Sequence, residues 1–241
     1  MKLDILAFGA HPDDVEISAG GTLAYQSQLG YSCGIVDLTR GDLGTRGTPE
    51  IRDQEADEAA KILGVKVREN LGFRDGFFLN DEQHQLEVIR MIRKYQPEIV
   101  LANAPVDRHP DHGKGGELVK TASFLAGLRK IETEEAGNIQ EAYRPRLVLH
   151  YIQFQNLKPD VILDIGTNIN VKMDAIKAYR SQFYDPNSKE PKTVISSKNF
   201  LESIEYRSRD MGRLIGVEYA EGFISAQDVG VADLMHLHSV R

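Results

Sequence analysis

Residues 3–16 read LDILAFGAHPDDVE, an apolar run followed by one histidine and three carboxylates. The first six residues have the length and flanks of a buried strand, and Pro12 among small residues is typical of a tight turn from a strand into a helix. His11 and Asp14 are three residues apart, close enough for one metal ion to bind both, and zinc accepts imidazole together with carboxylate. The alternative is that Asp13 and Asp14 only cap the following helix.

The same pattern returns further along the chain. Residues 99–112 read IVLANAPVDRHPDH, again an apolar run followed by imidazoles and carboxylates. Two of the seven histidines, His109 and His112, lie in this one HPDH motif. A second cluster of histidine and carboxylate after a second strand favours a metal site over simple helix capping.

The first half of the chain alternates strand-like runs with helix-like stretches. Strands are predicted over residues 3–8, 33–38, 65–71 and 99–102, and helices over residues 17–29, 48–63, 83–95 and 113–128. This order is typical of a parallel sheet with helices packed on both sides. We therefore predict an α/β fold: a Rossmann-like, doubly wound, mostly parallel sheet with helices on both faces.

The expected strand order brings the two motifs together. In a doubly wound sheet of order 3-2-1-4, the winding reverses between strands one and four, and ligands bind at the carboxyl ends of the strands that flank this switch. The HPDD motif follows the first strand, and the HPDH motif follows the fourth. We therefore expect one site built from both motifs.

The second half of the chain is less regular. Two strands and two helices are predicted there, over residues 146–154, 161–165, 169–183 and 197–214. Residues 132–142 are polar and are predicted to form a loop or a frayed helix. Residues 184–198, which include Pro186 and Pro191, are predicted to form a mobile loop that acts as a lid. Because no repeat or composition break divides the sequence, residues 1–241 are predicted to form a single domain.

Composition excludes several classes of partner. The 241 residues are 41% hydrophobic and 27% charged, as in an ordinary globular protein, and the net charge of −7 argues against nucleic acid or an anionic membrane surface as partner. The N-terminus lacks the apolar core of a signal peptide, and no stretch is long enough to span a membrane, so we expect a cytoplasmic protein. The single cysteine, Cys33, excludes an intrachain disulfide and is predicted to be a buried structural thiol.

Taken together, the two motifs resemble those of the LmbE-like, or PIG-L-type, zinc-dependent N-acetylglucosamine deacetylases. The resemblance extends through Arg52 and through residues 44–48, 71–76, 181–183 and 219–223. These added segments look closest to the bacillithiol-biosynthesis branch, whose substrate is N-acetylglucosaminyl malate. The resemblance implies a small-molecule amino-sugar conjugate as the partner and a homo-oligomer, either a hexamer or a trimer.

In that family, the first histidine, the second aspartate and the last histidine hold the metal. The resemblance therefore assigns His11, Asp14 and His112 to a zinc ion, although iron can use the same ligand types. Three protein ligands leave open positions for water and substrate, as catalytic zinc requires. Asp13 matches the family's general base. The spacing alone leaves open which of Asp13 and Asp14 is the ligand.

Further catalytic and substrate-binding residues follow from the same resemblance. His109 matches the residue that stabilises the oxyanion or protonates the leaving amine, and Asp111 is expected to orient its imidazole and favour its charged form. Arg52 resembles a substrate-binding arginine suited to the carboxylates of malate, the alternative being a solvated helix charge. Asp75 resembles a carboxylate that binds sugar hydroxyls, with a turn role as the alternative.

Several other residues receive weaker assignments. Asp107 stands where the mycothiol-pathway deacetylases carry a tyrosine, which agrees with a bacillithiol-type substrate. Tyr184, Arg144 and Arg146 could belong to a lid or contact the substrate, although structural roles fit them better. The other four histidines are assigned structural or tail positions; they are His84, His150, His236 and His238.

The leading hypothesis is thus a zinc-dependent hydrolase that removes acetyl from N-acetylglucosaminyl malate by means of metal-activated water and an aspartate base. One alternative keeps this chemistry for another N-acetylglucosamine conjugate or a chitobiose-like sugar. Another is a non-catalytic module that binds sugars or nucleotides. The module is disfavoured because the first turn lacks the G-x-G-x-x-G pattern and carries carboxylates where a phosphate would lie.

Overall fold

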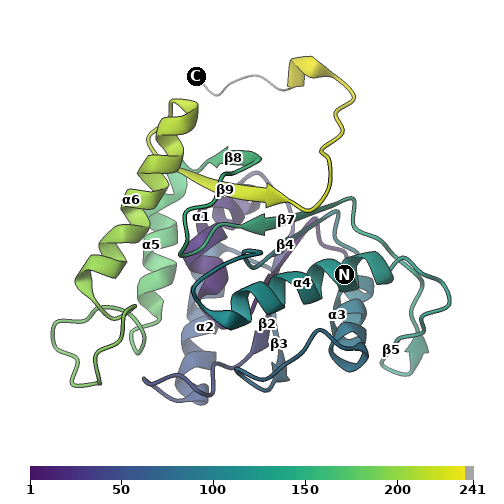
Figure 1. Cartoon of the computed structure of the whole chain (residues 1–241), viewed down its shortest axis with the longest axis horizontal. Helices are drawn as coiled ribbons and strands as arrows, with labels where there is room; N and C mark the ends of the chain where they lie inside the picture. Colours follow the sequence, from purple (N-terminus) through teal and green to yellow (C-terminus); the bar gives the residue numbers. More distant parts are fainter. Residues whose placement is uncertain (237–241) are drawn as a thin grey trace.

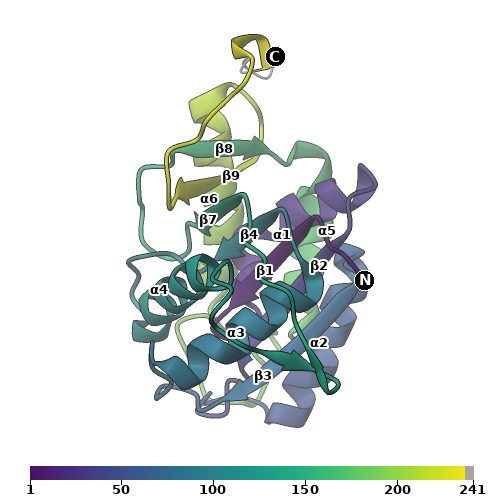
Figure 2. The same cartoon turned by 90° about the vertical axis from the view of Figure 1, so that its right-hand side faces the viewer.

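In the computed structural model, which describes residues 1–236, a single seven-stranded sheet organises the chain. The strand order is β3-β2-β1-β4-β7-β9-β8 (Figures 1 and 2). The strands are β1 Ile5–Gly9, β2 Cys33–Thr39, β3 Val67–Phe73, β4 Ile99–Ala102, β7 Leu147–Tyr151, β8 Val161–Asp164 and β9 Ala220–Ser225. The first five in this order pair in parallel, while β9 runs antiparallel to both of its neighbours.

Two layers of helices cover the sheet because its central strands are apolar on both faces (Figures 1 and 2). In β1, Ile5 and Ala7 face one layer, whereas Leu6 and Phe8 face the other. The first layer contains α1 Asp14–Gln28, α2 Pro49–Leu63, α5 Ile169–Ala178 and α6 Lys198–Ile215. The second layer contains α3 Glu82–Tyr95 and α4 Pro110–Leu125.

The predicted α/β class and the strand order 3-2-1-4 are confirmed. Local signals in the sequence account for several helix ends. Thr48 accepts a hydrogen bond from the backbone N–H of Ile51 at the start of α2, and Ser197 accepts one from Phe200 at the start of α6. The ends of β1 and β4 lie side by side, since these strands pair in parallel from Ile5 opposite Ile99.

The structure differs from the sequence-based prediction at three places in the second half. Residues 132–142 include a short hairpin, β5 Glu134–Glu135 and β6 Asn138–Ile139, whose turn places Ala136 and Gly137 at positive φ. The helix predicted over residues 169–183 ends at Ala178. Strand β9 was not predicted, because Glu221 and Gly222 interrupt its apolar pattern.

The remaining short elements are two 3₁₀ turns, Gly166–Asn168 and Leu234–His236. His238 lies outside the described residues. Within residues 1–236, no helix combines the length and the apolar character needed to cross a membrane. Cys33 is fully buried in β2, and burial raises the pKa of its thiol to about 11.

Candidate metal centre and active site

The HPDD motif forms the turn between β1 and α1. Asp13 has φ of 111° and ψ of −25°, a left-handed conformation that is rare for residues other than glycine, and its side chain makes no capping hydrogen bond to α1. Asp14 is the first residue of the helix, and its Oδ2 accepts a hydrogen bond from the backbone N–H of His11. Neither carboxylate therefore behaves as an ordinary cap of α1.

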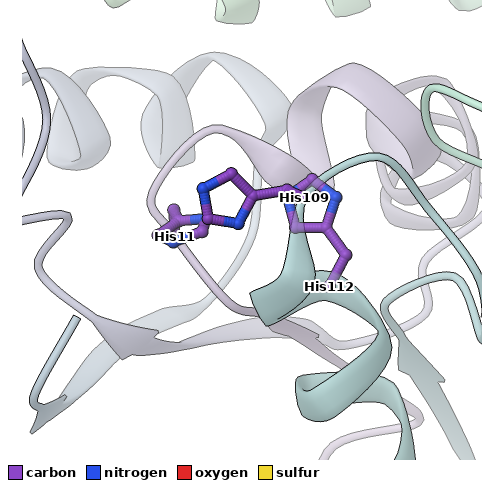
Figure 3. Close-up of side chains that lie close together, drawn as sticks. All are labelled: His11, His109 and His112. Carbon is purple, nitrogen blue, oxygen red and sulfur yellow. The ribbon is translucent and has the colours of Figure 1, made fainter. Parts of the chain in front are cut away.

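The HPDH motif opens α4 at the end of the neighbouring strand β4. Pro110 occupies the first helical turn, where its missing N–H costs nothing, and His109 precedes it in an extended conformation. As a result, His109 and His112 lie on the first turn of α4 and face the HPDD turn. Figure 3 shows the imidazoles of His11, His109 and His112 gathered at this point.

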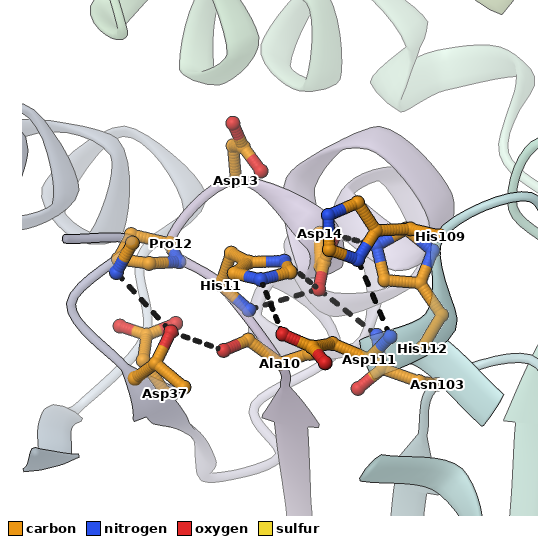
Figure 4. A network of polar contacts seen from close by, with 12 residues as sticks. Ala10, His11, Pro12, Asp13, Asp14, Asp37, Asn103, His109, Asp111 and His112 are labelled. Carbon is orange, nitrogen blue, oxygen red and sulfur yellow. Dashed lines mark hydrogen bonds and ion pairs between the residues drawn. The ribbon is translucent and has the colours of Figure 1, made fainter. Parts of the chain in front are cut away.

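Two overlapping groups of side chains could hold a metal ion. The ligand atoms of His11, His109 and His112 all lie within 4.8 Å of one another, and so do those of His11, Asp75 and Asp111. Asp14 stands between two of the imidazoles (Figure 4): its Oδ2 is 3.6 Å from His11 Nδ1, and its Oδ1 is 3.1 Å from His112 Nε2.

The second nitrogen of each of these two imidazoles faces another carboxylate. Nε2 of His11 is 3.1 Å from Asp75 Oδ1 and 3.4 Å from Asp111 Oδ2. Nδ1 of His112 is 2.6 Å from Asp107 Oδ2. A histidine with one nitrogen on the metal and the other on a carboxylate is the usual arrangement at metal centres, because the carboxylate fixes the ring and its tautomer. Asp14 belongs to neither of the two groups above, but its place between two imidazoles makes it a carboxylate that a metal ion at His11 and His112 could bind.

The carboxylates at this point stay ionised. Burial opposes ionisation of Asp14, but the charges and hydrogen bonds of His112 and His11 outweigh it and hold its pKa well below the usual range. Burial likewise disfavours the charged imidazole of His112, yet Asp14 and Asp107 raise its pKa to about 9. Such concentrated negative charge favours a bound cation.

Asp13 has a different environment from Asp14. Its carboxylate points away from the cluster of His11, Asp14 and His112 (Figure 4). Burial raises the pKa of Asp13 to about 7, although the charge of Arg52 lowers it. Arg52 Nη2 lies 3.3 Å from Asp13 Oδ2 and donates to the carbonyl of Pro12 at 2.6 Å, while Nη1 donates to Gly41 at 3.3 Å. Arg52 is therefore buried and binds the HPDD turn through Pro12 and Asp13, so it is not a solvated helix charge.

A cavity of about 650 Å³ opens above these side chains. Seven of the predicted site residues line it, namely His11, Asp13, Asp14, Arg52, Asp75, His109 and His112. Residues 192–195 of the predicted lid also line it, whereas Tyr184 does not. Arg144 donates to the carbonyl of Phe124, and Arg146 lies exposed beside Glu98; neither lines this cavity.

Asp111 is placed differently from the expectation. It is fully buried, and its carboxylate lies against His11 and, at 2.7 Å, against Lys114. Only its backbone N–H contacts His109, by donating to Nδ1 at 3.3 Å. Burial lowers the pKa of His109, with further contributions from His11 and His112, so the expected charged form is not favoured. The Asp111 carboxylate is instead held by His11, by Lys114 and by the backbone N–H of Gly76, which donates to its Oδ2 at 2.9 Å.

Three polar residues that were not predicted as site residues form hydrogen bonds with the candidate metal-binding side chains Asp14 and His112. Asn103 Nδ2 donates to Asp14 Oδ2 at 2.9 Å, and Gln153 Nε2 donates to Asp14 Oδ1 at 3.0 Å. Asp107, noticed in the sequence only as the absence of a tyrosine, supports His112. The five-residue spacing from Asp107 to His112 could have suggested that contact, but nothing local to Gln153 pointed to the site.

Comparisons with known proteins agree with this geometry. The family model for PIG-L, GlcNAc-PI de-N-acetylase, matches residues 6–123. A diacetylchitobiose deacetylase of Thermococcus kodakarensis is 30% identical over 229 residues, which cover 90% of this chain and 81% of that protein. A probable N-acetyl-alpha-D-glucosaminyl L-malate deacetylase 2 of Bacillus cereus is 27% identical over 76% of this chain and 84% of its own length. A conserved protein of Thermus thermophilus has a similar structure, with a TM-score of 0.85 and 37% identity over 95% of this chain and 97% of that one.

Proposed function

The chain belongs to the PIG-L family of de-N-acetylases and is a deacetylase of N-acetylglucosamine-type substrates, and from this we propose which residues carry the reaction and which conjugate is hydrolysed. The main support for this proposal is the position of Asp14, which lies between His11 and His112 and lines the cavity with them. Asp13 lines the same cavity, but its carboxylate points away from these three side chains.

We propose that His11, Asp14 and His112 hold a zinc ion, with iron as the alternative metal. Zinc bound there would supply a Lewis acid that polarises an amide carbonyl and acidifies water. Both oxygens of Asp14 are engaged with the imidazoles and with the amides of Asn103 and Gln153, which supports Asp14 rather than Asp13 as the ligand. The second nitrogen of each imidazole would be held by a carboxylate: Asp75 and Asp111 contact His11, and Asp107 contacts His112.

Asp13 is proposed as the general base. Its carboxylate points away from the three ligands and lies 3.3 Å from Arg52, but it lines the same cavity as the ligands, so it can accept a proton from a water that lies in the cavity between them. The water adds to the amide carbon, the carbon–nitrogen bond then breaks, and the proton passes to the departing amine. Acetate and a free amino sugar are the products. His109, which lines the same cavity, is proposed to stabilise the oxyanion or deliver that proton.

For the substrate, we propose N-acetylglucosaminyl malate, supported by the relative of Bacillus cereus and by the sequence segments shared with the bacillithiol branch. The alternative is a chitobiose-like sugar, supported by the relative of Thermococcus kodakarensis. Arg52 is not proposed to bind malate, since its two terminal nitrogens are already engaged by Pro12, Asp13 and Gly41.

A panel of substrates tests the proposal. Released amine is measured for N-acetylglucosaminyl malate, diacetylchitobiose and free N-acetylglucosamine with the zinc-loaded protein. The malyl conjugate is expected to have the highest kcat/KM. A higher kcat/KM for diacetylchitobiose would assign the alternative substrate, and no amine from any of the three would contradict the proposed function.

The proposed setting is the cytoplasm, with a small-molecule conjugate as the partner and neither nucleic acid nor membrane involved. The net charge of −7 supports the part of this proposal that leaves out nucleic acid and anionic membrane surfaces. We also propose a homo-oligomer, a trimer or a hexamer, on the basis of the family resemblance alone. Light scattering of the purified protein tests the assembly, and a monomer at micromolar concentration would contradict it.

A further inference from the structure

Arg207 lies on the inward face of α6, where most residues are buried and a charged side chain is unusual. The buried residues of this helix recur at helical spacing, at Phe200, Ile204, Ser208 and Met211. Arg207 is three residues beyond Ile204, so it shares this face, and it is half-buried. Its side chain lines the cavity that holds His109 and His112. A half-buried guanidinium loses part of its contact with water, so a carboxylate or another hydrogen-bond acceptor beside it would stabilise its charge.

The protein supplies no such partner within residues 1–236. No carboxylate in that part of the chain lies within ion-pair distance of the Arg207 guanidinium, and no hydrogen bond is made by it there. The acids whose charges act on it, Asp107 and Glu221, are already committed: Asp107 to His112, and Glu221 to Lys172 at 2.6 Å. Burial accordingly lowers the pKa of Arg207.

The other arginines of α6 behave differently. Arg209 pairs with Glu205 and Glu218, and Arg213 pairs with Asp210 at 2.9 Å on the exposed face. These are ordinary surface ion pairs, which contribute little. Arg207 thus differs from them in two ways: it lines the cavity, and its guanidinium has no carboxylate partner among residues 1–236.

Two more cations line the same cavity. The Arg108 guanidinium lies over the ring of Phe154, 4.9 Å from its centre, and Lys192 lies in the loop before α6. Neither has a carboxylate within ion-pair distance among residues 1–236. The carboxylates that line the cavity, by contrast, are held by the histidines or by Arg52. Within residues 1–236, the carboxylates that line the cavity are therefore paired, whereas Arg108, Lys192 and Arg207 have no carboxylate within ion-pair distance.

We propose that Arg207 determines specificity by binding a carboxylate on the aglycone of the substrate. This inference rests on the proposed function, which places the N-acetyl group at the metal centre. The planar guanidinium can donate to both oxygens of a carboxylate at once, which selects an anion by geometry as well as by charge. Arg108 and Lys192 add to the attraction, while Arg207 supplies the buried, directed contact.

The test compares two substrates of the same size and different charge. These are N-acetylglucosaminyl malate and the corresponding malamide, in which two carboxamides replace the two carboxylates. The zinc-loaded wild type is compared with Arg207→Gln, Arg207→Lys and the control Arg213→Gln, which changes an exposed arginine of the same helix. Thermal unfolding confirms that each variant is folded.

For Arg207→Gln, we expect kcat/KM to fall on the order of 10- to 100-fold on the malate, mainly through KM, and to change little on the malamide. Arg207→Lys should recover only part of this loss, because an ammonium group lacks the bidentate geometry. The control should match the wild type on both substrates. Equal losses on malate and malamide, or no loss on either, would overturn the inference.

Failure of the proposed function gives a different result. If the wild type releases no amine from either conjugate, the substrate proposal fails, and the binding of glucosaminyl malate and glucosaminyl malamide by calorimetry then decides the role of Arg207. Weaker binding of the malate alone by Arg207→Gln would support it. Equal affinities of wild type and variant for the malate would overturn it.

Discussion

Replacing Asp107 by asparagine is expected to weaken zinc binding. The Asp107 side chain is fully buried, and each of its oxygens faces two N–H groups. Oδ2 lies 2.6 Å from His112 Nδ1 and 3.3 Å from the backbone nitrogen of Phe154. Oδ1 lies 2.7 Å from the backbone nitrogen of Arg108 and 3.1 Å from that of Gln155. Asp107 therefore joins the imidazole of His112 to the loops around it.

The magnitude follows from these four contacts. Asparagine keeps one oxygen and puts an NH₂ group, which cannot accept, in place of the other. Whichever way the amide lies, two N–H groups lose their acceptor, and at about 1–3 kcal/mol each the free energy of unfolding should fall by about 2–6 kcal/mol. Loss of a carboxylate behind a metal-binding histidine lowers metal affinity about 10- to 100-fold. This corresponds to about 1.4–2.8 kcal/mol of binding free energy.

Zinc affinity is measured by competition with a chelating dye, and the free energy of unfolding by urea in the presence of a chelator. The matched control is Asp53→Asn, which changes an exposed carboxylate paired with Arg40 and should alter neither quantity. A zinc affinity for Asp107→Asn within about twofold of the wild type would show that metal binding by His112 does not depend on the Asp107 carboxylate.

Other predictions test the fold and the binding of Arg52 to the HPDD turn. Glu221→Ala should lower the free energy of unfolding by about 3–5 kcal/mol, because Lys172 is left buried and unpaired and the backbone N–H groups of Gly21 and Thr22 lose their acceptor. Adding Lys172→Met should restore only the part due to the lysine, and a urea-unfolding cycle with no recovery would contradict this. The Cys33 thiol, with its pKa raised to about 11 by burial, should not react with a thiol reagent at pH 8 until the protein is unfolded, and rapid reaction of the folded protein would contradict its burial. Arg52→Lys should lower kcat equally on malyl and malamide conjugates, since Arg52 holds Asp13 and not the aglycone; a loss confined to the malyl conjugate would contradict this.

The part of the site near β1 and β4 could be predicted because its signals are local. The apolar runs ending at Phe8 and Ala102 fix two strands, and the alternation of strands and helices makes them neighbours. The topology then places His11 and His112 together without any knowledge of side-chain geometry. The sequence could not show that Asp13 and Asp14 have different environments, because this difference depends on the left-handed conformation of Asp13.

The rest depends on contacts between segments far apart in the chain. Gln153 follows β7 and reaches Asp14 only because β7 pairs with β4. Strand β9 contains Glu221, and a charged residue at this point argues against a buried strand. Its burial is explained only by the ion pair with Lys172 on α5, which the sequence does not reveal. Arg207 looks like one more charge on an amphipathic helix, and only the packing of α6 turns it toward the cavity. Such pairings leave no periodic signal in the sequence.

The dependence of the reaction on a metal ion held by Asp14 is tested by a zinc titration of the metal-free protein, with amine release from N-acetylglucosaminyl malate as the readout. We expect no activity without metal and a linear rise in activity up to one equivalent of zinc per chain, with Asp14→Asn remaining inactive throughout this range. Full activity of the chelator-treated protein, or no amine release at any zinc concentration, would contradict this expectation.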